Sequence, residues 1–123
     1  MPLFESNRSF VIFSYVMSHG LLLLRSRKTE LTPTRMDVLF QDVRAMEVRA
    51  WFDGITIEEV DRKLLDGRPS NPMEMIEPGN KVYSLVGAGW EGFVVAGIIR
   101  FKEDEGEFFA PSGLIEPDTK YKK

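Results

Sequence analysis

The sequence predicts a mainly β fold, all-β or α+β, with about eight short, mostly antiparallel strands in a small barrel or sandwich. Apolar, β-branched and aromatic stretches of strand length recur along the chain, and turn-forming residues separate them at short intervals. Such short connections favour hairpins, because parallel strands need crossovers of a dozen or more residues. We find no internal repeat and predict one domain, 1–123, with mobile ends at 1–7 and 116–123.

Two strands are predicted first, at residues 8–18 and 20–28, around the turn Ser18-His19-Gly20. The first is apolar at both odd and even positions, as expected of a strand that is buried on two faces. The second begins with leucines but ends in Arg25-Ser26-Arg27-Lys28. We therefore expect its far end to leave the core.

Two more strands are predicted at residues 35–41 and 43–52. Apolar and polar residues alternate along 35–41, which is typical of a half-buried strand. Asp53-Gly54 then predicts a hairpin, because a type I′ turn needs positive φ at its central residues and this dipeptide tolerates it. The chain should return into a short strand at 55–57.

One short helix is predicted near residues 58–66. Thr56 and Glu59 have the spacing of a capping box, and a glycine follows at the C-cap position. Continuation of the strand through Val60 is the alternative. Three prolines exclude a central strand from residues 67–80.

The run Gly87-Ala88-Gly89-Trp90-Glu91-Gly92 follows a predicted strand at 81–86 and spells G-x-G-x-x-G. That pattern binds a pyrophosphate when it opens a helix inside a βαβ unit. Here the next residues, 93–102, are rich in β-branched side chains and predict a strand instead. We interpret the glycines as a bent hairpin loop, with Trp90 either packed back over the core or offered to a partner.

Composition excludes several kinds of chemistry. The chain has no cysteine, which rules out disulfides and thiolate catalysis and suits a cytoplasmic location. A net charge of −3 gives no overall basic footprint for nucleic acid. No apolar run has the length of a membrane-spanning helix, and no signal-peptide cleavage site is recognisable. The acidic turn at 103–106, before a short predicted strand at 107–110, lacks the spacing of a calcium loop, so we predict no metal or cofactor.

His19 is the only histidine, which excludes a multi-histidine metal site. Its neighbour Ser18 points to the opposite face of an extended chain, the wrong geometry for a nucleophile and its base. We predict a polar turn residue, with a general base as the alternative, and no catalytic residue.

Charged residues on two strand faces are candidates for binding. Arg25 and Arg27 share a face near Lys28 and Arg35, and such a cluster either meets an anionic partner or forms a solvated strand end.

Glu47, Arg49 and Trp51 share another strand face. Together with Tyr15 they either line a cavity inside a barrel or form an outward face with ion pairs.

No set of nucleophile, base and metal ligands converges, so we predict a soluble, non-catalytic domain that binds another protein or itself. A homodimer would cover apolar residues that occur on both strand faces. The alternative is a small-molecule-binding β-barrel protein or enzyme with an internal pocket. The predicted ligand- or partner-binding residues are Trp90, Trp51, Glu47, Arg49, Arg25, Arg27 and His19.

Overall fold

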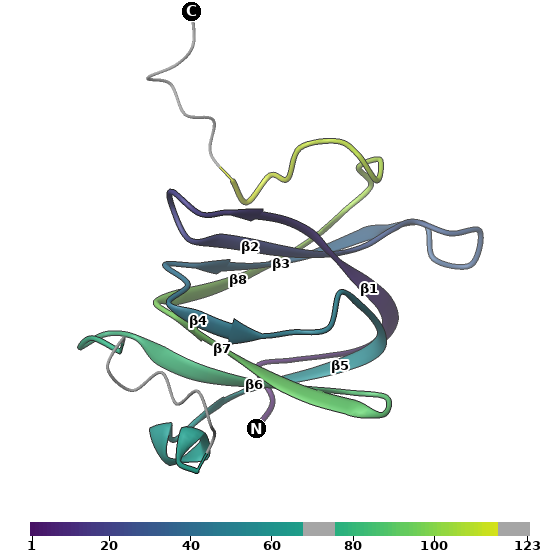
Figure 1. Ribbon diagram of the computed structural model, residues 1–123. Coiled ribbons are helices and arrows are strands. Elements are labelled where there is room, and N and C mark those ends of the chain that lie inside the picture. Colours follow the sequence, from purple (N-terminus) through teal and green to yellow (C-terminus); the bar gives the residue numbers. More distant parts are fainter. Residues whose placement is uncertain (68–75, 116–123) are drawn as a thin grey trace, which may run out of the picture.

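The computed structural model describes residues 1–67 and 76–115, and it confirms the mainly β fold. Eight strands form one antiparallel sheet in the order β4-β7-β6-β5-β1-β2-β3-β8. They are β1 (Phe4–Val16), β2 (Leu21–Ser26), β3 (Arg35–Gln41), β4 (Ala45–Glu47), β5 (Trp51–Val60), β6 (Lys81–Gly87), β7 (Trp90–Ala96) and β8 (Ile98–Asp104). The sheet does not close into a barrel. It curls into two layers, with β1 and β5 curving from one to the other (Figure 1).

The hairpin predicted at Asp53-Gly54 is wrong, because these residues lie inside the continuous strand β5. Gly54 has a φ of 72°, and the pairing of β5 with β1 shifts register between Ser6 and Ser9. Between these two residues Asn7 and Arg8 of β1 lie opposite Gly54 alone, so the β-bulge is in β1 and the glycine with positive φ faces it within a continuous strand. Bulges bend a strand and increase its twist, so this one helps β1 and β5 curve between the layers.

The predicted helix is reduced to a single 3-10 turn, η1 (Arg62–Leu65). Asp61 caps it by accepting a hydrogen bond from the Lys63 backbone N at 2.8 Å. β5 continues through Val60, which was the alternative, because residues 56–60 pair with β6.

Other boundaries also differ from the prediction. β1 begins at Phe4, within a segment expected to be mobile, and residues 43–52 divide between β4 and the start of β5. Residues 107–110 form a turn rather than a strand. The predicted mobile tail 116–123 and part of the proline-containing loop, 68–75, lie outside the described residues.

Gly97 divides the strand predicted at 93–102 into β7 and β8. Its backbone N donates to the Gln41 carbonyl at 2.9 Å, and the Arg44 backbone N donates to the Val95 carbonyl at 2.8 Å. One bent stretch of chain thus pairs with β6 through its first half and with β3 through its second half. This corner joins the two layers of the curled sheet.

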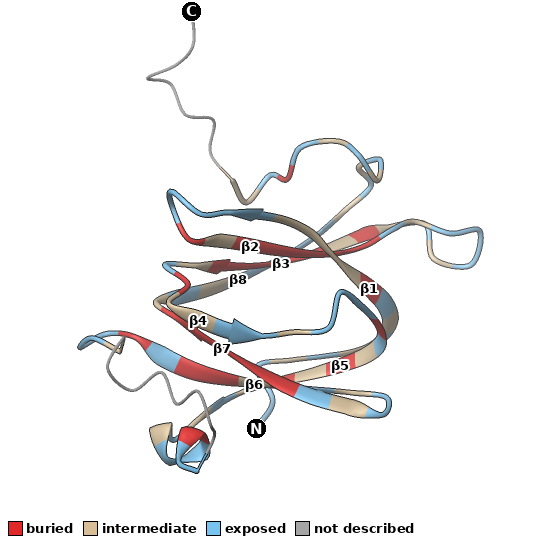
Figure 2. Ribbon diagram, in the orientation of Figure 1, coloured by how far each residue is buried: buried red, intermediate tan, exposed pale blue. Residues whose placement is uncertain are grey.

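The space between the layers is filled by side chains from seven strands, and buried residues follow β2, β3, β6 and β7 (Figure 2). Four rings are central to this core: Phe10, Phe40, Phe52 and Tyr83. On the outer side of β6 and β7, a second cluster buries Val82, Phe93 and Val95 against Leu65 of η1. Apolar residues on both strand faces are therefore covered largely by the chain itself.

Replacing Gly92 with alanine should detach β4 from β7. A Cβ at Gly92 would lie 2.0 Å from the Glu47 carbonyl oxygen, so the two backbones must separate. We expect a loss of about 1–3 kcal/mol in the free energy of unfolding. Hydrogen exchange should show lost protection across Ala45–Glu47. Gly89→Ala is the comparison, because its φ of 77° makes alanine strained but no atom lies within 4 Å; equal protection in both variants would contradict this account.

Candidate functional site

Residues 105–115 cross the outer face of the layer that contains β2, β3 and β8, and buried Arg25 fixes them there (Figure 1). The Arg25 guanidinium donates from Nε and Nη2 to the two carboxylate oxygens of Asp37, at 2.8 and 3.1 Å. Its Nη1 donates to the carbonyls of Phe108 and Ala110 at 2.5 and 2.8 Å. The Phe13 ring lies 4.1 Å from the guanidinium carbon. Arg25 is therefore a buried clamp for this segment, which we call the strap.

Arg35 forms a second clamp one strand further along the sheet. It makes two hydrogen bonds of 2.9 Å to the Asp104 carboxylate and donates to the carbonyls of Glu107 and Ala110 at 2.7 and 3.1 Å. Hydrogen bonds from Arg35 hold the pKa of Asp104 below its ordinary value of 3.8, and a hydrogen bond from the Gly106 backbone N acts in the same direction.

The expectation that this strand end leaves the core is therefore wrong. Arg25 and Arg35 are 1% and 3% exposed, because each has a carboxylate directly beside it and carbonyls above it. Lys28 pairs with Glu107 at 2.8 Å. Only Arg27 keeps an exposed position, 5.8 Å from the Phe108 ring centroid. The cluster does not present a basic surface.

Trp90 packs back over the core. Its ring centroid lies 4.7 Å from that of Phe52, and its Nε1 is buried without a hydrogen-bond partner among the described residues. Gly87 permits this position, since a Cβ there would lie 2.3 Å from Nε1. The glycine run is the β6–β7 hairpin, with Gly87 paired to Trp90 across the turn.

Trp51 is the most exposed aromatic residue within the strands, at 69%. Its neighbour Phe52 points into the core, so Trp51 points outward, and it pairs with Val11 of β1. Two residues further along β1, Phe13 contacts the rings of Phe108 and Phe109 of the strap. Phe109 is 85% exposed. Trp51, Val11, Phe13 and Phe109 form what we call the aromatic surface.

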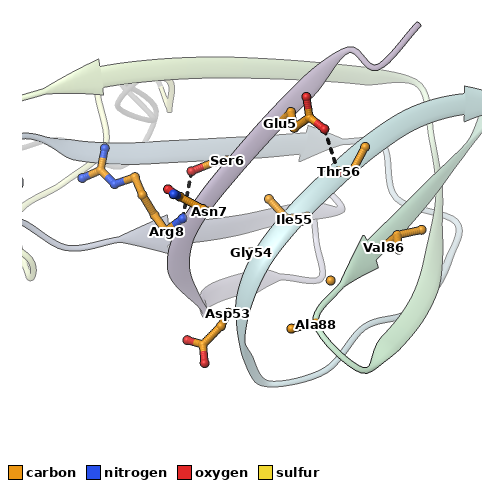
Figure 3. A pocket seen from close by; sticks show the side chains of 11 residues that line it. Glu5, Ser6, Asn7, Arg8, Asp53, Gly54, Ile55, Thr56, Val86 and Ala88 are labelled. Atoms are coloured by element: carbon orange, nitrogen blue, oxygen red, sulfur yellow. Dashed lines mark hydrogen bonds between the residues drawn. The ribbon is translucent and has the colours of Figure 1, made fainter.

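An open groove of about 680 Å³ begins at Asp53, two residues after Trp51, and includes the bulged part of β1 (Figure 3). The β6–β7 hairpin forms one wall and the start of β1 the other, and the hairpin tip is fixed by a hydrogen bond from the Ala88 backbone N to the Asp53 carbonyl, 3.1 Å long. The lining residues are Glu5, Ser6, Asn7, Arg8, Asp53, Gly54, Ile55, Thr56, Val86, Gly87 and Ala88. The lining is more apolar than polar.

The other predicted residues are placed apart from one another. Tyr15, Glu47 and Arg49 are exposed, as is Trp51, so these four side chains do not line an internal cavity; the interior holds core side chains instead. His19 is exposed in the turn between β1 and β2. Arg49 has no ion-pair partner among the described residues.

Sequence reasoning missed Phe13, Phe109 and the groove. The adjacent Phe108 and Phe109 in an otherwise polar segment were the available signal for the strap, because a large apolar ring such as Phe108 tends to pack on another part of the chain. The groove had no local signal, since it is assembled from three separate strands.

Comparisons with protein-family models, curated proteins and solved structures find no match for this chain. Among residues 1–67 and 76–115, no group of three or more metal-ligating side chains gathers, and no helix is long and apolar enough to cross a membrane. The aromatic surface and the groove beside it are the candidate site.

Replacing one member of the buried Arg25–Asp37 pair should destabilise the protein, whereas replacing both members should have a much smaller effect. Arg25→Met leaves the Asp37 carboxylate buried without a counterion, which should lower the free energy of unfolding by about 3–5 kcal/mol. The double variant Arg25→Met, Asp37→Leu should recover most of this loss, because neither charge then needs solvation. Urea unfolding at neutral pH measures both. A double variant no more stable than the single one would refute the ion-pair explanation.

The strap should loosen in acid through Asp104. Because its pKa is lower when folded than when unfolded, Asp104 stabilises the protein above pH 3.8 and loses this contribution as the pH falls through the folded value. The stability difference between the wild type and Asp104→Asn should therefore be full at neutral pH and shrink below pH 3.8. Urea unfolding across this range tests it, and a difference independent of pH would contradict it.

Proposed function

We propose that this protein is a non-catalytic domain that binds protein through the aromatic surface around Trp51. The exposure of Trp51, 69% at the start of β5 where this strand pairs with β1, supports this most directly. The strap lies across one outer face of the sheet, and η1 packs on the other. Trp51 and Phe109 are left as large apolar groups that no described segment covers.

The composition of this surface supports a protein partner. Tryptophan, phenylalanine and arginine are enriched in protein interfaces, where a few such residues provide most of the binding energy. Arg27 and Arg49 are both exposed; Arg27 lies 5.8 Å from the Phe108 ring centroid, and Arg49 precedes Trp51 by two residues. Trp51 is also presented rigidly, because β5 is hydrogen-bonded to β1 beneath it. A pre-positioned aromatic side chain loses little conformational entropy on binding.

The alternative function, binding of a small molecule in an internal pocket, has less support. It depended on Tyr15, Glu47, Arg49 and Trp51 lining a cavity, whereas all four are exposed. The open groove is the remaining place for a small ligand.

Trp51→Ala should abolish the protein–protein contact. Truncating a central aromatic anchor costs about 2 kcal/mol or more, which is roughly a thirtyfold loss of affinity. Chemical cross-linking with quantitative mass spectrometry of the tagged protein should show every specific partner, including a second copy of the chain, depleted in the variant. Leu31→Ala is the control, because Leu31 is 96% exposed in a loop outside the aromatic surface. Unchanged cross-links in Trp51→Ala would overturn the proposal.

A further inference from the structure

We infer that the partner of Trp51 is a second copy of this chain, in which the indole of each copy docks into the groove of the other. This inference rests on the proposed function and adds the identity of the partner. Three observations support it: Trp51 is exposed, the groove has an apolar wall, and residues of opposite charge lie near Trp51 and in the groove.

Trp51 has the form of an inserting group. It is the first residue of β5, its side chain lies on the outer side of the strand, and 69% of its surface is exposed. The residue paired with it, Val11, is small beside an indole, so the ring rises above its neighbours. An exposed side chain of this shape is best buried by a concave surface.

The groove has the form of a receiving site. Its volume is about 680 Å³ and it is open to one side, so it can cover one face of an indole rather than enclose the ring. Its apolar wall is formed by Val86, which is 45% exposed, and by Ala88. Gly54 and Gly87 also line the groove and have no side chains that would narrow it.

Charge is complementary between the two parts. Arg49 precedes Trp51 by two residues, is exposed and has no ion-pair partner among the described residues. The groove contributes the exposed carboxylates of Glu5, which accepts a hydrogen bond from Thr56, and of Asp53, which accepts one from Ser9. The cationic head of Arg8 points away from Val86 and Ala88, and it binds Thr34 and lies 3.8 Å from Glu103 (Figure 3). Docking of Trp51 into the groove of a second copy would thus place Arg49 close to the carboxylates of Glu5 and Asp53.

The position of the two parts permits symmetry. Asp53 lines the groove and follows Trp51 by two residues on the same strand, so the inserting ring and the receiving groove are adjacent. A two-fold axis between them lets both contacts form at once, as an isologous interface requires. Two indoles bury about 150–250 Å² each, which is less than the ~800 Å² per partner of stable complexes. We expect a reversible, concentration-dependent dimer.

Two variants test the inserting Trp51 ring and the receiving groove separately. Trp51→Ala removes the inserting ring and keeps the groove. Val86→Arg fills the groove with a long cationic side chain that repels Arg49, and Glu91, which pairs with Val86 across β6 and β7, accommodates the new charge. Circular dichroism and thermal unfolding confirm that each variant is folded.

Sedimentation velocity should show the wild type and Leu31→Ala shifting towards dimer as concentration rises, and each variant alone remaining monomeric. Mixing Trp51→Ala with Val86→Arg should give a heterodimer that is weaker than the wild-type dimer but stronger than the homodimer of either variant, because one intact ring meets one intact groove. Native mass spectrometry identifies it, since the two chains differ in mass.

A wild type that stays monomeric at every concentration, a variant that still dimerises, or a mixture without heterodimer would each overturn the inference. Its failure is distinguishable from failure of the proposed function. A monomeric wild type whose cross-links to another protein depend on Trp51 would retain the proposed function and reject only the second copy.

Discussion

The buried ion pair between Arg25 and Asp37 is the interaction on which the outer side of the molecule depends. A guanidinium loses several kcal/mol of hydration on burial, and a carboxylate alone does not use all of its donors. The donors left over are satisfied by the carbonyls of Phe108 and Ala110, which belong to the strap. The pair therefore requires the strap to lie across this face, where Leu23 and Leu39 are almost fully buried. Arg35 and Asp104 repeat the arrangement at the neighbouring strand.

The aromatic surface has two separate supports as a result. Phe109 is presented by the strap, which the arginine clamps hold, whereas Trp51 is presented by β5, which its pairing with β1 holds. Local opening of the strap would displace Phe109 and expose Phe13 without moving Trp51. Protonation of Asp104 should therefore not weaken a contact that depends only on Trp51 and the groove.

Local patterns in the sequence predicted elements whose environment is local. The alternation of 35–41 predicted the extent of β3 correctly, but the prediction that it is half-buried was wrong, because Arg35, Asp37 and Leu39 on its outer face are buried as well. The β-branched residues after the glycines correctly excluded a helix. Local patterns did not predict contacts between residues that are far apart in the sequence. The sequence predicted that Arg25 and Arg35 either meet an anionic partner or are solvated, because Asp37 and Asp104 become their neighbours only after β2, β3 and β8 assemble. Phe13 and Phe109 meet for the same reason.

The Asp53-Gly54 dipeptide shows how one local signal supports two structures. Positive φ at Gly54 is compatible with a hairpin turn and with a strand position opposite a bulge, and pairing with β1 on both sides of the glycine selects the second. The bulge itself is in β1, where Asn7 and Arg8 together face Gly54. All three residues line the groove, and the Asp53 carbonyl holds the hairpin tip that forms another wall. The dipeptide that predicted a turn therefore forms part of the groove, two residues after the exposed Trp51.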